Sequence, residues 1–572
     1  RKDSIPWYDL VLAAVAAFSS MYLVIFFNDL ITRAGLPTTT DLAMGFVLIA
    51  LLLEATRRVS NPILPGIAIF SLLYCYFGRY FPDMFAHRGF DIPRIVNHMY
   101  LGTEGIFGVP LGVSSTFVFM FILFGTFLEQ TGMGKFIIDL AMAIAGWSTG
   151  GPAKVAVVSS GLMGTISGSS VANVCTTGMF TIPLMKSVGY RPYFAGAVEA
   201  VASTGGQIMP PVMGAAAFIM AEFLGIPYIK VALAAVIPAL LYYLAVIVQV
   251  HLEASRLGLK GLPREQLPHI WSLLKSKGQL LIPLIGIIYF LLAGYTPIKA
   301  AFYGILLNMA CSYLNRETAL TLPKYRNALE NGARTALGVA AACATVGMVV
   351  GMATLTGLGL RIAGAIVEIA HGSLIVTLIM TMITSILLGA GLPTTANFIV
   401  TSTMAAPALF ALGVPPIAAY MFVLYFGIAA DLSPPVALAA YAGAGIAGDD
   451  PMKTGFTAMK LALAGFLVPY IYIYNPMLVL VNPEPLSLTL SVVTAIIGVF
   501  LLGIGTIGFY KAQVHWILRI VAMAGALGLM IPGLKSDLVG LAVLVGLHLL
   551  QSKKAKRAKA SPAEPVCEET KD

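Results

Sequence analysis

Long apolar runs separated by short polar segments follow one another along almost the whole chain. The first run, at residues 7–27, is too long for a signal-peptide core, so we interpret it as a membrane span. A helix of about 20 apolar residues crosses the hydrocarbon core of a bilayer. The runs are continuous rather than alternating, which predicts spanning helices and not barrel strands. With 7–27 they give about 14 spans, the others lying at 41–56, 62–78, 112–130, 193–224, 231–250, 280–294, 298–314, 335–354, 414–445, 456–475, 487–510, 515–531 and 537–550.

Two further apolar segments, 151–188 and 373–413, are interrupted in the middle by small polar residues. The first interruption runs from Gly164 to Asn173 and the second from Gly389 to Asn397. Turn residues at mid-depth are tolerated only where protein or a water-filled cavity surrounds them. Both segments are therefore predicted to be re-entrant helical hairpins.

Each hairpin is followed by a helix that is itself broken. The breaks are Ser203–Pro211 and Gly427–Pro435, and each ends in a pair of prolines, which remove backbone donors and unwind a helix. The freed carbonyls, together with side-chain oxygens, suit a hard cation such as Na⁺. Helix N-termini at the same breaks suit a carboxylate.

The two halves of the chain form an internal repeat. Asn173 matches Asn397 at an offset of 224 residues. The hairpins are separated by five predicted crossings, an odd number, so the second half is predicted to be inverted in the membrane, as in secondary transporters. The other matches are Pro183 with Pro407, Gly189 with Gly413, Pro192 with Pro416, Pro210-Pro211-Val212 with Pro434-Pro435-Val436, Pro227 with Pro451 and, at offset 225, Thr131-Gly132-Met133-Gly134 with Thr356-Gly357-Leu358-Gly359.

Composition and charge support a polytopic all-α membrane protein. Apolar residues make up 58% of the 572, charged residues only 11%, and mean hydropathy is +0.88. Soluble proteins carry about 25% charged residues, so a water-soluble fold is excluded. The net charge of +9 is attributed to basic cytoplasmic loops rather than to nucleic-acid binding. If both termini lie in the cytoplasm, nearly all clusters of basic residues lie on the cytoplasmic side of the membrane. These clusters are Arg1-Lys2, Arg57-Arg58, Lys186 with Arg191, the basic residues of segments 251–278 and 315–334, and Lys553–Arg557.

Few residues offer other chemistry. The five cysteines form no CxxC pair and the seven histidines are scattered, so we expect no disulfide framework, no transition-metal site and no enzyme active site. Gly503–Gly508 matches a dinucleotide fingerprint but lies inside an apolar run, so it indicates helix packing. Asp431 is the only acid in the four interruptions; it is either a cation ligand or proton carrier, or a structural cap. Glu199 is either a satisfied buried polar group or a proton site.

The two segments that contain the hairpin interruptions and the helix breaks resemble a known family of transporters. The segment Gly164–Pro211, with its Gly-Ser-Ser-Val-Ala-Asn and Gln-Ile-Met-Pro-Pro motifs, resembles the large membrane subunit of TRAP (tripartite ATP-independent periplasmic) transporters. Gly389–Tyr441, with Pro-Thr-Thr-Ala-Asn and Leu-Ser-Pro-Pro-Val, resembles its second half. The spans before residue 90 resemble the small subunit fused in front, as in TAXI-type permeases, although three spans stand where the family typically has four.

The resemblance implies three regions: small-subunit-like scaffold helices at 1–90, a transport core at 91–475 with repeats at about 112–250 and 335–475, and extra spans with a disordered polar tail at 476–572. It implies an elevator-type, ion-motive importer of small organic acids in the bacterial inner membrane, loaded by a periplasmic substrate-binding protein. The coupling ion is Na⁺ or H⁺, and no other cofactor is expected. A stand-alone Na⁺–carboxylate symporter of similar hairpin design is the alternative; a membrane enzyme or a channel fits less well.

The tips and breaks supply the site residues that the resemblance implies. Those expected to bind the cation are Gly168, Ser169, Asn173, Gly205, Gln207, Thr394, Asn397, Asp431 and Ser433, and those expected to bind substrate are Ser170, Thr204 and Thr395.

Overall fold

The chain is helical throughout the part that its computed structural model describes, residues 6–33, 35–59, 62–82, 85–530 and 533–560. Within these ranges the only β-pairing is an isolated bridge between Phe509 and Gln513. Eight helical runs among the described residues are long and apolar enough to cross a membrane, and several shorter apolar helices accompany them. The predicted all-α membrane class is confirmed; the number of about 14 spans stays a prediction.

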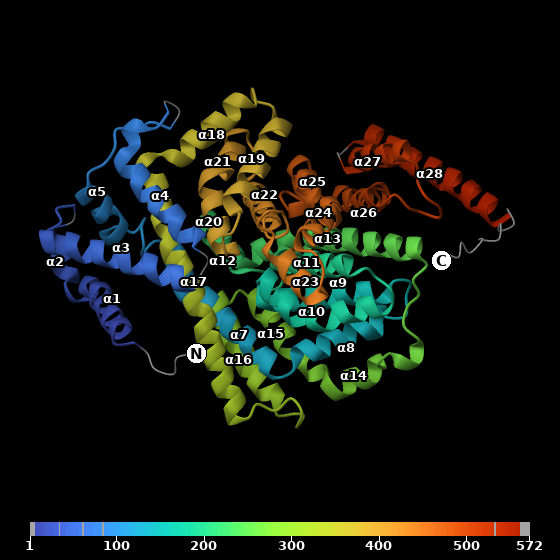
Figure 1. Cartoon of the computed structure of the whole chain (residues 1–572), viewed down its shortest axis with the longest axis horizontal. Helices are drawn as coiled ribbons and strands as arrows, with labels where there is room; N and C mark the ends of the chain where they lie inside the picture. Colours follow the sequence, from blue (N-terminus) through green and yellow to red (C-terminus); the bar gives the residue numbers. More distant parts are fainter. Residues whose placement is uncertain (1–5, 34, 60–61, 83–84, 531–532, 561–572) are drawn as a thin grey trace, which may run out of the picture.

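The N-terminal helices form a separate layer on one side of the molecule, at the left of Figure 1. Helices α3 and α4 of this layer pack against the long helix α17 (Leu322–Thr356), and Thr56 of α3 meets Thr345 of α17 with 2.6 Å between their hydroxyl oxygens. Asp41 holds the layer together, since its buried carboxylate accepts from Tyr22 at 2.6 Å and Arg33 at 2.8 Å. The layer comprises α1 (Trp7–Ile25), α2 (Phe27–Thr32), α3 (Thr39–Val59) and α4 (Ile63–Phe77).

A polar connector links this layer to the core. Its described residues contain three short helical turns: η1 (Gly78–Tyr80), α5 (Ile92–Val96) and η2 (Asn97–Leu101).

The first repeat contains the first predicted hairpin and the first broken helix. The hairpin is α9 with α10, interrupted at Gly168-Ser169, and the broken helix is α11, which ends at Gly205 and resumes as α12. The repeat comprises α6 (Val109–Val113), η3 (Ser114–Val118), α7 (Phe119–Gln130), α8 (Met133–Ala145), α9 (Gly151–Ser167), α10 (Ser170–Ser187), α11 (Pro192–Gly205), η4 (Gly206–Ile208), α12 (Ala215–Leu224) and α13 (Tyr228–Leu257).

The second repeat has the same order of elements. Its hairpin is α19 with α20, and its broken helix is α22, which ends at Ala429 and resumes as α23. The repeat comprises α17, α18 (Leu358–Ile369), α19 (Leu374–Gly389), α20 (Thr394–Met404), α21 (Ala406–Ala411), α22 (Pro416–Ala429), α23 (Leu438–Ala447), α24 (Pro451–Phe466) and α25 (Val468–Tyr474).

Unusual backbone conformations recur at positions that the predicted repeat matches. Met213 and Ala437, 224 positions apart, both have positive φ angles (61° and 36°), which are uncommon for residues with a side chain. Gly132 and Gly357 are left-handed residues (φ 88° and 69°) that cap α8 and α18. Because unusual dihedral angles recur at matched positions, the repeat is structural and not only a similarity of composition.

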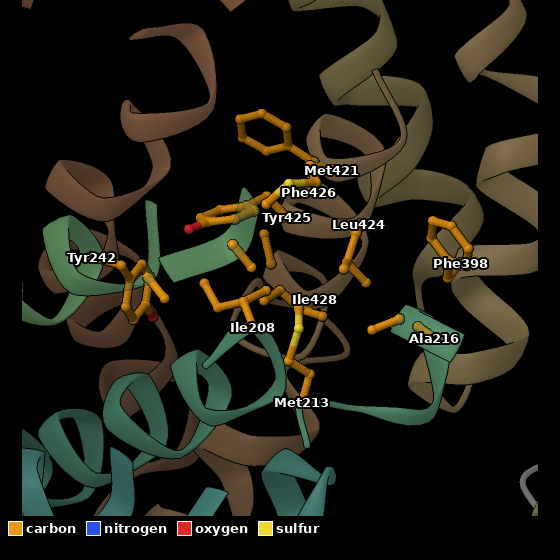
Figure 2. Close-up of a cluster of buried hydrophobic side chains, with 14 of the residues drawn as sticks. Ile208, Met213, Ala216, Tyr242, Phe398, Met421, Leu424, Tyr425, Phe426 and Ile428 are labelled. Atoms are coloured by element: carbon orange, nitrogen blue, oxygen red, sulfur yellow. The ribbon is translucent and has the colours of Figure 1, made fainter. Parts of the chain in front are cut away.

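The two repeats are interlocked. Helix α23 of the second repeat packs on α10 and α11 of the first, and α12 of the first packs on α20 and α22 of the second. Figure 2 shows the centre of this contact, where Ile208 and Met213 from the first break lie against Ile428 of α22. The reciprocal exchange buries each break under the opposite repeat.

The remaining helices lie between and after the repeats. Between them are η5 (Arg264–Gln266), α14 (Ile270–Lys277), η6 (Gly278–Leu280), α15 (Leu281–Leu292) and α16 (Pro297–Ser312). After them come η7 (Pro476–Val479), α26 (Pro485–Ile507), α27 (Trp516–Met530) and α28 (Leu534–Ala560), at the right of Figure 1.

Residues 551–560, at the start of the polar C-terminal tail, are helical. Helix α28 continues to Ala560, and the alanines and lysines of this stretch are strong helix formers. Residues 561–572, Cys567 among them, and the basic pair Arg1-Lys2 lie outside the described residues.

A close helix contact between the repeats allows a test of the interlock. Gly196 of α11 and Gly443 of α23 touch through backbone, so a Cβ at position 443 would lie 2.6 Å from the carbonyl oxygen of Gly196. We expect Gly443→Ala to lower the free energy of unfolding by about 1–3 kcal/mol, the usual cost of overpacking, measured by thermal unfolding in detergent. Gly445→Ala is the control on the same helix, since nothing lies within 4 Å of its Cβ position; equal stability of the two variants would contradict the contact.

Candidate functional site

The first hairpin tip turns at Gly168 and Ser169. Gly168 has φ +62°, and a Cβ there would lie 3.1 Å from the carbonyl oxygen of Met213, so a side chain is excluded by both conformation and space. Ser169 is extended, and its hydroxyl accepts from the Ala172 N–H at 3.4 Å, which caps α10. The tip therefore lies directly on the loop that follows the first break.

The second hairpin tip is the segment between Gly389 and Thr394. Gly391 has φ +76°, and α20 begins after Pro393, which lacks a backbone N–H. A Cβ at Gly389 would lie 2.4 Å from Nδ2 of Asn397. The glycine thus makes room for the asparagine that the repeat places on the opposite arm of the hairpin.

Both helix breaks close into compact loops. In the first, the Gly214 N–H donates to the Gln207 carbonyl at 2.9 Å; in the second, the Ala439 N–H donates to the Asp431 carbonyl at 3.0 Å. Gln207 and Asp431 are the repeat-related pair, so each loop is closed on the same position. These closures satisfy backbone groups that could not be left unpaired in a membrane.

Asp431 connects the two repeats through its side chain. Its Oδ2 accepts from the hydroxyl of Ser170 at 2.6 Å, and Nε2 of Gln207 lies 3.5 Å from the same oxygen. Asp431 is only 8% exposed, and Ser170 and Gln207 are buried. An acid of one repeat is thus held by the hairpin tip and the break of the other.

The two repeat-related asparagines share an unusual environment. Asn173 donates from Nδ2 to the Ser160 carbonyl at 2.8 Å, and Asn397 donates from Nδ2 to the Gly427 carbonyl at 2.6 Å. Both Oδ1 atoms are buried with no hydrogen-bond partner in the described structure, and so is Oε1 of Gln207. Three buried, unpaired amide oxygens at the tips and breaks are candidate cation ligands, because an unpaired buried acceptor costs free energy unless something binds it.

A cavity of about 440 Å³ lies between the tips and the breaks on one side and helices α7 and α17 on the other. Four helices begin at its wall, each with its N-terminal residue among the lining residues: Ser170 (α10), Ala215 (α12), Thr394 (α20) and Leu438 (α23). Helix N-termini carry partial positive charge and unpaired N–H groups. Among the described lining residues, the charged side chains are Asp431 and Glu129, with no Lys or Arg. Among the described lining residues, the groups that favour an anion are therefore the helix N-termini rather than basic side chains.

The structure brings six of the sequence-predicted site residues together at the cavity: Gly168, Ser169, Ser170, Thr394, Thr395 and Asp431. Asn173, Gln207 and Asn397 lie behind this wall, buried in the hairpins and breaks.

The other three predicted residues do not line the cavity. Thr204 is fully buried and donates to the Ala200 carbonyl of its own helix at 2.9 Å. Gly205 packs against the ring of Tyr242, and the Ser433 hydroxyl donates to the Ala429 carbonyl at 2.8 Å. These geometries suit helix packing and closure of the break.

Sequence reasoning missed the far wall of the cavity. Phe121 and Gly125 of α7 and Thr335 and Val339 of α17 line it. Their spacing, four residues apart on each helix, is that of one helix face, but an apolar helix gives no signal of which face meets a cavity.

Hairpins, paired helix breaks and a cavity between them are features of membrane transport proteins. Within the described residues, no group of three or more His, Cys, Asp or Glu side chains converges. The chain belongs to the family described as tripartite ATP-independent periplasmic transporter, DctM component, whose model matches residues 47–486.

Curated relatives agree with this family. A putative TRAP transporter large permease protein of Haemophilus influenzae is 28% identical over 194 residues, 33% of this chain and 45% of the relative. The 2,3-diketo-L-gulonate TRAP transporter large permease protein YiaN of Escherichia coli is 24% identical over 362 residues, 62% of this chain and 83% of the relative. The isethionate TRAP transporter permease protein DctMQ of Oleidesulfovibrio alaskensis is 25% identical over 369 residues, 61% of this chain and 55% of the relative. The match therefore spans less than half of the first relative and most of the second.

The contact between Ser170 and Asp431 can be tested by a double-mutant cycle. We expect Ser170→Ala and Asp431→Asn each to lower the unfolding free energy, with a coupling of about 1–3 kcal/mol between them, because a hydrogen bond to a charged group is lost. Thermal or denaturant unfolding in detergent measures this. Ser433→Ala paired with Asp431→Asn is the control, because the Ser433 hydroxyl donates to the Ala429 carbonyl and not to Asp431. If the effects of Ser170→Ala and Asp431→Asn on the unfolding free energy are additive, the contact contributes no stability.

Proposed function

We propose that this chain is the membrane permease of a secondary importer that carries small organic acids across the bacterial inner membrane. The observation that carries the proposal is the convergence of four helix N-termini on one cavity that no Lys or Arg among the described residues lines. Backbone N–H groups at helix N-termini bind carboxylates and other anions without a fixed charge that would hold them permanently. Two relatives are named as transporters of 2,3-diketo-L-gulonate and isethionate, which are both organic anions.

The transported anion is proposed to be coupled to Na⁺ or H⁺. The unpaired buried oxygens of Asn173, Gln207 and Asn397 support cation sites behind the cavity wall. Asn173 and Asn397 lie at repeat-related positions, Gln207 matches Asp431, and the broken helices beside them provide further carbonyl oxygens. A cation bound there would offset the charge of the anion at mid-membrane, where an uncompensated charge costs several kcal/mol.

The proposed mechanism is an elevator. The hairpins and broken helices form one side of the cavity, and α7 with α17 forms the other. Movement of the first group as a block against the second would carry the site across the membrane. The N-terminal layer packs on α17 through α3 and α4, which supports its assignment to the fixed scaffold, as a fused small subunit of TAXI type.

The basic residues support a topology with both termini in the cytoplasm. Arg57 and Arg58 lie at the end of α3, and the 251–278 segment contains several basic residues at the end of α13. In this orientation the end of α7 with Glu129 is cytoplasmic, so the cavity extends from the hairpin tips toward the cytoplasm.

The function is tested by uptake into proteoliposomes containing the purified chain. The probes are radiolabelled succinate, 2-oxoglutarate, glutamate and pyruvate, offered with and without each candidate periplasmic binding protein from the host. We expect gradient-driven uptake of at least one acid only when its binding protein is present. Rapid uptake without any binding protein would favour the stand-alone Na⁺–carboxylate symporter.

The cation sites are tested by Asn173→Ala and Asn397→Ala. We expect each variant to need a higher concentration of the coupling cation for half-maximal uptake, by about ten-fold if one ligand contributes about 1.4 kcal/mol. Asn308→Ala is the control: Asn308 is also a buried asparagine with unpaired amide atoms, but it lies in α16, outside the site. If both tip variants follow the parental cation dependence, the tips are packing elements only.

A further inference from the structure

A second buried acid lies outside the cavity, in the contact between the first hairpin and the first broken helix. Glu199 of α11 is fully buried. Its Oε1 lies 2.5 Å from the hydroxyls of Ser160 (α9) and Thr177 (α10), and its Oε2 lies 2.5 Å from the hydroxyl of Thr181 (α10). Ser203, one turn along α11, adds a hydroxyl at 3.2 Å. We refer to these four hydroxyls as the hydroxyl cage.

The spacing of these oxygens indicates protons and not a metal ion between them. Oxygens of different residues around a hard cation in octahedral geometry, with ligand distances of about 2.4 Å, are separated from one another by roughly 3.4 Å. The carboxylate oxygens and three of the cage hydroxyls are separated by 2.5 Å, and the hydroxyls of Ser160 and Thr177 by 2.9 Å. These are hydrogen-bond distances, so the cage leaves no room for a cation between its members.

The cage suits both protonation states of the acid. When Glu199 is ionised, all four hydroxyls can donate to it. When it is protonated, it can donate to a cage hydroxyl, and two threonines can turn to backbone carbonyls already within reach: Thr177 to that of Asn173 at 2.8 Å, and Thr181 to that of Thr177 at 3.1 Å. Rotation of hydroxyl groups is therefore sufficient to accommodate gain or loss of a proton.

No charged side chain of the packed helices faces the carboxyl group. The titratable neighbour is the phenol of Tyr243 on α13, which donates to the Ala202 carbonyl at 2.8 Å. Lys154 of α9 donates to Ser148, and Lys186 of α10 donates to the Ala447 carbonyl. On α24, Lys453 lies over the Tyr193 ring and Lys460 is exposed, while α23 contains no charged residue. A buried carboxylate without a basic partner has only the cage to stabilise its charge.

The cage is also joined to the candidate cation site. The Ser160 carbonyl accepts from Asn173, and the Thr177 hydroxyl reaches the Asn173 carbonyl. The second repeat has no equivalent acid, because Val423, Ala405 and Gly427 stand at the positions that match Glu199, Thr181 and Ser203. The acid is therefore not required to build a hairpin of this kind.

We propose that Glu199 and its hydroxyl cage form an exchangeable proton-binding site, which loads and releases a proton when the first hairpin opens away from α11, a local movement within the block that is separate from the elevator movement of the block itself. The carboxylate binds one proton from solvent on one side of the membrane and releases the same proton on the other, so no further reactant is needed. This deepens the proposed transport function by naming one coupling ion and its residue.

Proton binding is tested without any substrate, by infrared difference spectroscopy of the purified chain in lipid at a series of pH values. We expect a protonated-carboxyl band that titrates in the parent and is absent in Glu199→Gln. Thr181→Val removes the hydroxyl donor to Oε2, which destabilises the ionised form, and should shift the midpoint of the band to higher pH. Glu222→Gln, an exposed acid on α12, is the control and should keep the parental band. A spectrum of Glu199→Gln identical to the parental one would overturn the proposal.

Coupling is tested in the same proteoliposomes, with whichever acid probe the parent takes up and with the inside made alkaline. A pH step of one unit can drive about a ten-fold accumulation per coupled proton. We expect Glu199→Gln to lose this component and its pH dependence while it retains exchange of labelled for unlabelled acid. Parental accumulation by Glu199→Gln would contradict a role in coupling. Failure of the parent to transport any acid would instead refute the proposed function and leave the infrared result unaffected.

Discussion

Backbone polar groups inside a bilayer must find partners within the protein, and this constraint organises the whole core. Each unpaired group costs several kcal/mol in hydrocarbon, yet the chain interrupts its helices at two hairpin tips and two breaks. The break loops close on themselves, through Gly214 on Gln207 and Ala439 on Asp431. The opposite repeat then covers each break, since α23 packs on α10 and α11 while α12 packs on α20 and α22. The helix breaks and the packing of each repeat over the other thus satisfy the same constraint together. Four of the helix N-termini that the interruptions create lie at the cavity.

Small residues make this arrangement possible. Gly164 of the first hairpin and Gly206 of the first break lie so close that a Cβ on either would be about 2.5 Å from the Cα of the other. Gly196 and Gly443 also touch through backbone between the repeats, where a Cβ on Gly196 or on Gly443 would lie 2.9 Å or 2.6 Å from the carbonyl oxygen of the other glycine. Where backbones approach this closely, van der Waals packing replaces the hydrophobic effect, which is weak between helices in lipid. The glycines therefore determine how deeply the asparagines and acids are buried, and with it their chemistry.

The sequence was sufficient to predict the elements but not the contacts between them. Interrupted apolar runs and paired prolines predicted both hairpins and both breaks, and the offset of 224 residues predicted which positions are equivalent. Positions that match in the repeat need not be in contact, however. Ser170 and Asp431 form a hydrogen bond although they are 261 positions apart, and the repeat offset of 224 residues does not pair them. Thr204 shows that a polar residue at a predicted break need not face the cavity. It follows Ser203 at the start of a break, but a threonine hydroxyl in a helix readily bonds to the carbonyl four residues earlier, and it does so here.

The same comparison shows that the two repeats differ in the charge of two matched positions, one in each helix break and one on the helix before it. Gln207 stands opposite Asp431, and Glu199 stands opposite Val423, so each repeat holds one acid where the other holds a neutral residue. If the two repeats are inverted relative to each other and had the same charges, the hairpin and broken helix of one repeat would bind ions at one face of the membrane as the other repeat does at the opposite face. Asp431 faces the cavity and is held by groups of the opposite repeat, whereas Glu199 is enclosed by its own hairpin and helix. One acid is therefore placed to respond to the cavity and its contents, and the other to the closure of a hairpin on its helix. On the proposed mechanism, this division would give the two repeats different ways of linking charge to movement.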